Sequence, residues 1–125
     1  MKIKTSIGEA VDKLSILFIK MEKITDPVKL QNVKKEYDYL SKELLKRDIT
    51  VDHELFKNIL EVNRRLWDIE DFLREKELKK EFDEAFISVA RSVYKTNEER
   101  SKWKRELDNL FNSHFSEEKQ YAAFQ

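Results

Sequence analysis

Asn63, Glu70 and Arg74 are the residues whose types and spacing in this sequence could do chemistry together. At about 100° per residue, a helix over residues 55–76 places all three on one face, in the middle of a broad apolar seam. Glu70 and Arg74 are four residues apart, so they can form an ion pair. Burying such groups costs about 1–3 kcal/mol for each unmade hydrogen bond, and more for a charge, so each needs a partner.

Two interpretations of this polar cluster are open. In the first, Asn63, Glu70 and Arg74 form a buried network that fixes the register between helices. In the second, they form the floor of a pocket that binds a polar ligand. Helical bundles often carry buried polar networks, and this favours the first interpretation.

Further cations follow in the last third of the chain. If the helices there fold back on residues 55–76, Arg91, Arg100 and Lys104 approach the cluster. Together with Tyr94 they would form a polar pocket with aromatic walls, suited to a phosphate or carboxylate. The alternative is that the basic side chains lie along apolar surface with their charged ends in water. That alternative is favoured for Lys104, and the two are balanced for Arg91.

The element that must position these groups is one long helix over Leu55–Lys76. Its apolar residues recur at intervals of three and four, which is the spacing of a buried helix face. One row of the seam consists of Leu55, Ile59, Val62, Leu66, Ile69 and Leu73, and the other of Phe56, Leu60 and Trp67. We expect this helix to be central in the fold.

A first helix is predicted to precede it, from a capping box at Ser6–Glu9 to about Ile24. Its main apolar stripe leaves Ile16 and Ile19 on the other side of the helix. A helix that is apolar on two faces lies either at the centre of a bundle or at an interface. We therefore expect a homodimer, with Ile16 and Ile19 as candidate interface residues.

The remaining boundaries follow from caps and turn residues. Asp26–Pro27 starts a second helix that ends near Arg47, and Thr50 or Asp52 caps the central helix. Asp83 caps a short fourth helix with four residues facing inward: Phe86, Val89, Ala90 and Val93. A second capping box, Thr96–Glu99, starts a fifth helix. Residues 113–125 form a C-terminal tail that is either docked or loose.

Composition excludes several classes of function. Lys plus Arg equals Asp plus Glu at 25 each, so the basic footprint of a nucleic-acid-binding protein is missing. Without cysteine there is no disulfide framework, thiol catalysis or zinc–thiolate site. The two histidines, His53 and His114, have no metal-binding spacing, so we expect no metal and no cofactor. The longest apolar run, Ile16 to Ile19, is too short for a bilayer, and no signal peptide is visible. We expect a cytoplasmic protein without membrane contact.

Several stretches together resemble a family of short, uncharacterised bacterial and phage proteins. They are SIGEAVDKLSILFIK at Ser6–Lys20, NRRLWDIEDFLREKE at Asn63–Glu77 and ARSVYKTNEERSKWKRELD at Ala90–Asp108, supported by ITDPVKLQNVKKE at Ile24–Glu36 and EEKQY at Glu117–Tyr121. The resemblance covers nearly the whole chain and implies a cytoplasmic helical protein, with no assigned reaction. The chain departs from the family pattern at Lys79–Lys80, where other members look glycine-containing.

The sequence therefore predicts an all-α fold, an antiparallel bundle of four to five helices in one domain over residues 1–125. The leading functional prediction is a non-enzymatic binding or interaction module, homodimeric, with a polar pocket around Glu70 and Arg74. The alternative is a small metal-independent enzyme that acts on a phosphorylated or carboxylated metabolite. In that enzyme Arg74, Arg91 and Arg100 would hold the anion, and Glu70 would be the general acid or base.

Overall fold

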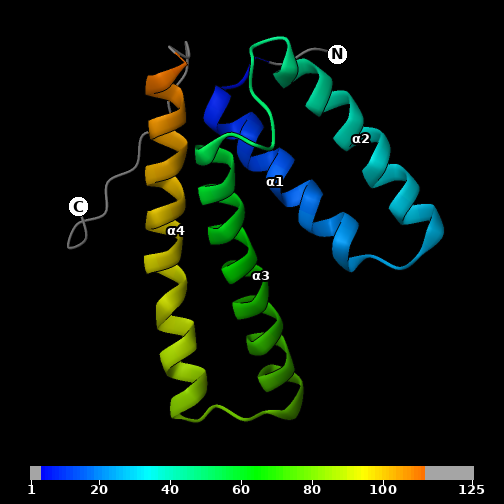
Figure 1. The fold of residues 1–125 in the computed structure, drawn as a ribbon. Helices are drawn as coiled ribbons and strands as arrows, with labels where there is room; N and C mark the ends of the chain where they lie inside the picture. Colours follow the sequence, from blue (N-terminus) through cyan, green and yellow to red (C-terminus); the bar gives the residue numbers. More distant parts are fainter. Residues whose placement is uncertain (1–3, 112–125) are drawn as a thin grey trace.

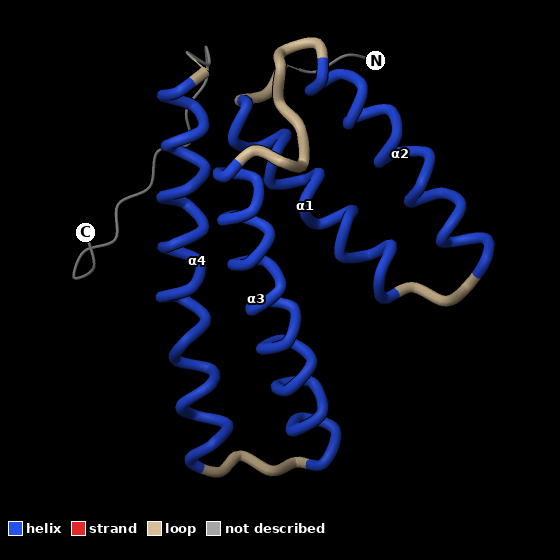
Figure 2. The backbone as a smooth tube through the Cα atoms, in the orientation of Figure 1, coloured by secondary structure: helices blue, strands red, loops and turns tan. Residues whose placement is uncertain are grey.

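The computed structural model describes residues 4–111, which form four α-helices and no strand. They are α1 (Ile7–Lys23), α2 (Pro27–Leu45), α3 (Glu54–Lys79) and α4 (Glu84–Leu110). Figure 1 shows two antiparallel helix hairpins, α1–α2 and α3–α4, and Figure 2 shows the loops that connect the helices, of which the one between α2 and α3 is the longest. The predicted all-α bundle is confirmed.

The helix starts depend on side chains that accept hydrogen bonds from backbone amides left without a partner in the first turn. Ser6 Oγ accepts from Glu9 N at 3.0 Å, and Asp26 Oδ1 accepts from Val28 N at 2.9 Å. Asp83 Oδ1 accepts from Phe86 N at 3.0 Å. The predicted cap of α3 is wrong, because His53 Nδ1 accepts from Leu55 N instead. Thr50 Oγ1 accepts only from Asp52 N, within the loop.

The predicted fourth and fifth helices are one continuous helix, α4. The capping-box pattern at Thr96 is therefore misleading. Thr96 lies in the middle of α4, and its hydroxyl donates to the Ser92 carbonyl at 2.8 Å rather than accepting from an amide. The pattern marks a helix start only where the preceding turn is not helical. Here the preceding residues continue the helix.

α1 is the element that packs against all three other helices, whereas α2 packs only on α1. The expectation that α3 is central is therefore wrong. The outward position expected for Ile19 is also wrong, because its side chain is only 1% exposed, and Ile16 is half-buried. A helix that is apolar on two faces lies either at the centre of a bundle or at an interface, and for α1 the central position is correct.

The α3–α4 hairpin extends well beyond α1 and α2 (Figure 1). The main hydrophobic core lies at the other end, where Val11, Leu14, Ile59 and Leu107 are almost completely buried. We call residues 67–95 the projecting hairpin. No residue in this range is fully buried. The predicted tail, residues 113–125, lies outside the described residues.

Candidate functional site

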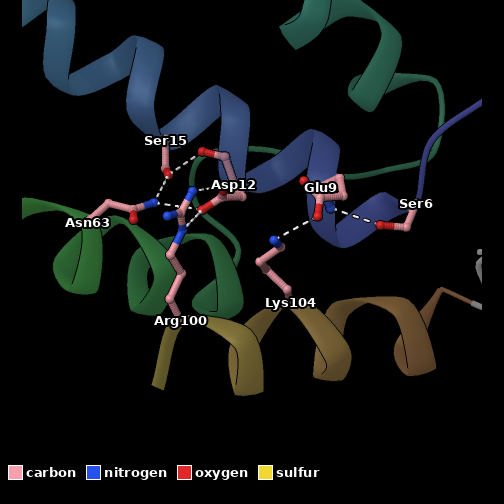
Figure 3. Close-up of polar contacts among 7 residues, drawn as sticks. All are labelled: Ser6, Glu9, Asp12, Ser15, Asn63, Arg100 and Lys104. Atoms are coloured by element: carbon pink, nitrogen blue, oxygen red, sulfur yellow. Dashed lines mark hydrogen bonds and ion pairs between the residues drawn. The ribbon is translucent and has the colours of Figure 1, made fainter. Parts of the chain in front are cut away.

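A buried ion pair between Asp12 of α1 and Arg100 of α4 is the centre of the polar interior (Figure 3). Arg100 Nε donates to Asp12 Oδ1 at 2.8 Å, and Arg100 Nη2 donates to Asp12 Oδ2 at 2.5 Å. The side chain of Asp12 is 5% exposed and that of Arg100 is 28% exposed. This fork geometry is the strongest that a guanidinium makes with a carboxylate, and it fixes the angle between the two helices.

Asn63 of α3 completes the cluster. Its Nδ2 donates to Asp12 Oδ1 at 2.9 Å and to Ser15 Oγ at 2.7 Å. The Ser15 hydroxyl donates in turn to the Asp12 carbonyl at 2.6 Å. Four side chains from three helices are thus joined, as a register-fixing network requires. Because the Ser15 proton goes to a carbonyl oxygen, the hydroxyl is not aimed at a base that could activate it.

A second set of polar contacts joins the start of α1 to the end of α4. Lys104 Nζ pairs with Glu9 at 2.7 Å, and its side chain is 8% exposed (Figure 3). The expectation that the Lys104 ammonium lies in water is therefore wrong. Asp108 Oδ1 accepts from Gly8 N at 2.7 Å, which places a carboxylate at the positive end of α1. The other oxygen, Asp108 Oδ2, is buried without a hydrogen-bond partner among the described residues.

The structure separates the predicted site residues into two groups. Asn63, Arg100 and Lys104 lie at the packed end, in the two sets of contacts just described. Glu70 and Arg74 lie on the projecting hairpin, and both are exposed. Their predicted mutual ion pair is wrong, because Arg74 Nη1 instead contacts Asp71 Oδ1 at 2.9 Å.

The other two candidates lie on α4. Arg91 is exposed and Tyr94 is half-buried, and both line a shallow hollow along the helix surface. Within the described residues, no hydrogen bond or ion pair joins Arg91 to Glu70 or Arg74. The expected single pocket, built from all seven residues, is therefore not formed. Whether any of these residues binds a ligand stays a prediction.

Sequence reasoning missed Asp12, the acceptor at the centre of the cluster. A signal was present, because Asp12, Ile16 and Ile19 are spaced by four and three residues and share one face of α1. Burial of that face buries Asp12 with it, so a buried cationic partner was required. The basic residues of α4 were the available partners.

Electrostatic contacts elsewhere stabilise the surface of the α3–α4 hairpin. Arg65 contacts Glu61 and Glu99, and the hydrogen bond that it donates to Glu61 is the main cause that raises the pKa of Arg65. At the tip, Lys76 Nζ contacts Asp83 at 2.9 Å and Glu81 at 3.0 Å, and these bonds raise the pKa of Lys76. Residues 4–111 contain no group of three or more acidic, histidine or cysteine side chains that could hold a metal ion.

Fold and site together define a small all-helical domain whose buried polar groups join helices. The chain belongs to the family described as "Family of unknown function (DUF6165)", whose model matches residues 1–124. This confirms the family of unknown function predicted from the sequence. Neither a curated protein nor a solved structure matches the chain. Within residues 4–111, no helix is both long and apolar enough to cross a membrane.

Proposed function

We propose that the protein is a non-enzymatic helical interaction module, which binds another protein through the projecting hairpin. One observation carries this proposal: the hairpin is rich in large apolar residues, yet none is fully buried. These residues are Trp67, Ile69, Phe72, Leu73, Leu78, Phe82, Phe86, Ile87, Val89 and Val93. Leu78 is 80% exposed, Phe82 54% and Ile87 52%.

Two helices alone bury too little apolar surface to be stable as a separate layer. Helix stability in proteins comes mostly from packing of an apolar face against a further element. At the packed end α1 supplies that element, but beyond α1 the α3–α4 pair has no further layer among the described residues. Exposed apolar surface of this kind is typical of a binding site for another protein.

The buried polar contacts support the same function. The Asp12–Arg100 pair and the Lys104–Glu9 pair hold α4 against α1. They fix the direction in which the hairpin projects, because both lie at its base. A rigid base lowers the entropy that the hairpin loses when it binds a partner.

The enzyme alternative has less support from the geometry. Arg100, one of its three anion clamps, already makes two hydrogen bonds to Asp12. Arg91 is nine residues away on the same helix, which is a rise of about 14 Å. Glu70, its proposed acid or base, lies on an open surface that water reaches freely, whereas a reacting group is usually held in a site that excludes water.

Photo-cross-linking in the cells that naturally make the protein tests the interaction. A benzophenone amino acid replaces Ala90 on the hairpin, or Tyr39 on the outer side of α2 as the control. We expect one discrete protein adduct from position 90, which is lost when Phe86→Glu is added, and no such adduct from position 39. The absence of any protein adduct at position 90 would overturn the proposal.

A further inference from the structure

The face of the projecting hairpin that continues the α1-binding surface can be located from helix periodicity. At the packed end, Asn63 of α3 and both Lys104 and Asp108 of α4 contact α1. Residues seven and eleven positions after Asn63 share its direction, and they are Glu70 and Arg74. Eighteen residues make five helical turns, so Phe86 and Ala90 share the direction of Lys104 and Asp108.

We call Glu70, Arg74, Phe86 and Ala90 the uncovered face, because α1 does not extend this far along α3 and α4 (Figure 1). It combines an aromatic residue, a small residue and two opposite charges. Glu70 makes no hydrogen bond or ion pair with the described part of the chain. The Arg74 side chain is 66% exposed and contacts only Asp71 there. The face thus presents a glutamate and an arginine four residues apart, and they do not pair with each other.

We propose that the uncovered face binds a second copy of the same chain, with the two hairpins antiparallel. This inference rests on the proposed function and names the partner. When two copies of α3 cross antiparallel about a two-fold axis level with residue 72, Glu70 of each copy faces Arg74 of the other. One surface then supplies both members of two ion pairs, as a symmetric interface requires. The four helices of the two hairpins form a four-helix bundle that buries Phe86.

The size of the face predicts how tight this contact is. The segments 67–79 and 84–95 are about 20 Å long, and two adjacent helices are about 20 Å wide. The face covers about 400 Å² in projection on each copy, or about 800 Å² for both, which is below the roughly 1,200 Å² of stable specific interfaces and in the range of weak, transient contacts. We therefore expect a reversible dimer rather than a permanent one.

Sedimentation equilibrium on the purified full-length chain, with charge-swap variants, tests the geometry. We expect the wild type to change from a 15.1 kDa monomer to a dimer of twice that mass as its concentration rises. Glu70→Arg and Arg74→Glu should each weaken dimerisation about tenfold, and the double variant should recover most of the loss. The matched control exchanges Glu75 and Lys79, which form an ion pair on the opposite side of α3. This exchange should leave the dissociation constant of the dimer unchanged.

A cross-link provides a second measurement, because the chain has no cysteine of its own. Glu70→Cys mixed with Arg74→Cys should form the mixed disulfide faster than either variant forms its own. A wild type that is monomeric at several hundred micromolar, or a dimer without recovery in the double variant, would overturn the antiparallel contact. A heterologous photo-adduct at position 90 would then still support the interaction module. If no protein adduct forms there, the proposed function fails as well.

Discussion

Gly8 of α1 and Lys104 of α4 are in backbone contact. A β-carbon placed on Gly8 would lie 2.3 Å from the Lys104 carbonyl oxygen and 2.9 Å from its carbonyl carbon. Neither atom can move without a shift of α4, because both belong to the helix backbone. The only glycine of the sequence therefore lies where the backbones of α1 and α4 are in contact, and its missing side chain leaves room for the Asp108 hydrogen bond to the Gly8 amide.

Gly8→Ala should lower the free energy of unfolding by about 3 kcal/mol, because the added methyl group forces α1 and α4 apart. The sign of this change in the free energy of unfolding distinguishes a steric clash from the ordinary effect of helix propensity. Glycine to alanine within a helix normally stabilises by about 0.5–1 kcal/mol when space is available. Urea unfolding followed by circular dichroism measures the change. The control is Ala85→Gly at an exposed position in the first turn of α4, which should cost less than about 1 kcal/mol. A Gly8→Ala protein as stable as wild type would contradict the close contact.

Breaking the buried ion pair should cost more than breaking a surface pair. Asp12→Asn leaves the Arg100 guanidinium without its charge partner, and we expect a loss of about 3–5 kcal/mol in urea unfolding. Arg65→Gln, which breaks the exposed pairs to Glu61 and Glu99, should cost less than about 1 kcal/mol. Equal losses at Asp12 and Arg65 would mean that the Asp12 carboxylate is hydrated in solution.

The sequence predicted the helices and most of their caps, because these depend on local spacing. It placed Asn63, Glu70 and Arg74 correctly on one face of α3, yet only Asn63 is buried. Periodicity gives the direction of a side chain but not the length of the helix that covers it. With 17 residues, α1 is about 25 Å long, whereas α3 with 26 residues is about 39 Å long.

The position of α1 could not be predicted for a related reason. Two apolar faces on one helix require two covering surfaces, and the sequence does not say whether these come from the same chain or from a second copy. Ile19 is covered by the same chain. Similarly, Thr96 has the spacing of a cap, and only the helical turn before it excludes that role. The covering of Ile19 and the role of Thr96 depend on contacts and turns that the local spacing of residues does not predict.

Ser6→Ala should cost about 1 kcal/mol, since it removes the acceptor for the Glu9 amide at the start of α1. Thr96→Ala should not show a capping loss, because the Thr96 hydroxyl donates to a carbonyl within α4. Amide exchange distinguishes the two. The Glu9 amide should exchange faster in Ser6→Ala, whereas the Glu99 amide in Thr96→Ala should stay as protected as in wild type.

Lys80→Gly should stabilise the protein by about 1 kcal/mol. Lys80 has φ 54° and ψ 38°, a left-handed conformation that costs a residue with a β-carbon about 1–2 kcal/mol. It ends α3 in a Schellman motif, in which Glu81 N donates to the Lys76 carbonyl and Lys80 N to the Glu77 carbonyl. Lys79→Gly, one residue earlier, should destabilise instead, because Lys79 is still helical. Thermal unfolding of both variants measures the two opposite shifts.

The tip of the projecting hairpin should loosen in acid when the Asp83 carboxylate is protonated. Hydrogen bonds from Lys76 and, next, from the Phe86 amide lower the pKa of Asp83 below its ordinary value of 3.8. A carboxylate with a lowered pKa stabilises the folded state above its unfolded pKa. This contribution is lost as the pH falls below about 3.8 through the folded pKa. At alkaline pH the raised pKa of Lys76 has the opposite effect. The Lys76 ammonium stabilises the folded state at lower pH, and this stabilisation is lost only as the pH rises above 10.5.

Between these limits both charges are present and the tip is held together. Acid titration followed by NMR should therefore show the Phe86 amide losing its hydrogen-bonded chemical shift below pH 3.8, together with faster exchange. The matched variant is Lys76→Met, which removes the largest cause of the shift but keeps the Phe86 bond. In that variant the Asp83 transition should move up toward 3.8. An Asp83 transition at the same pH in both proteins would show that Lys76 does not contact Asp83 in solution.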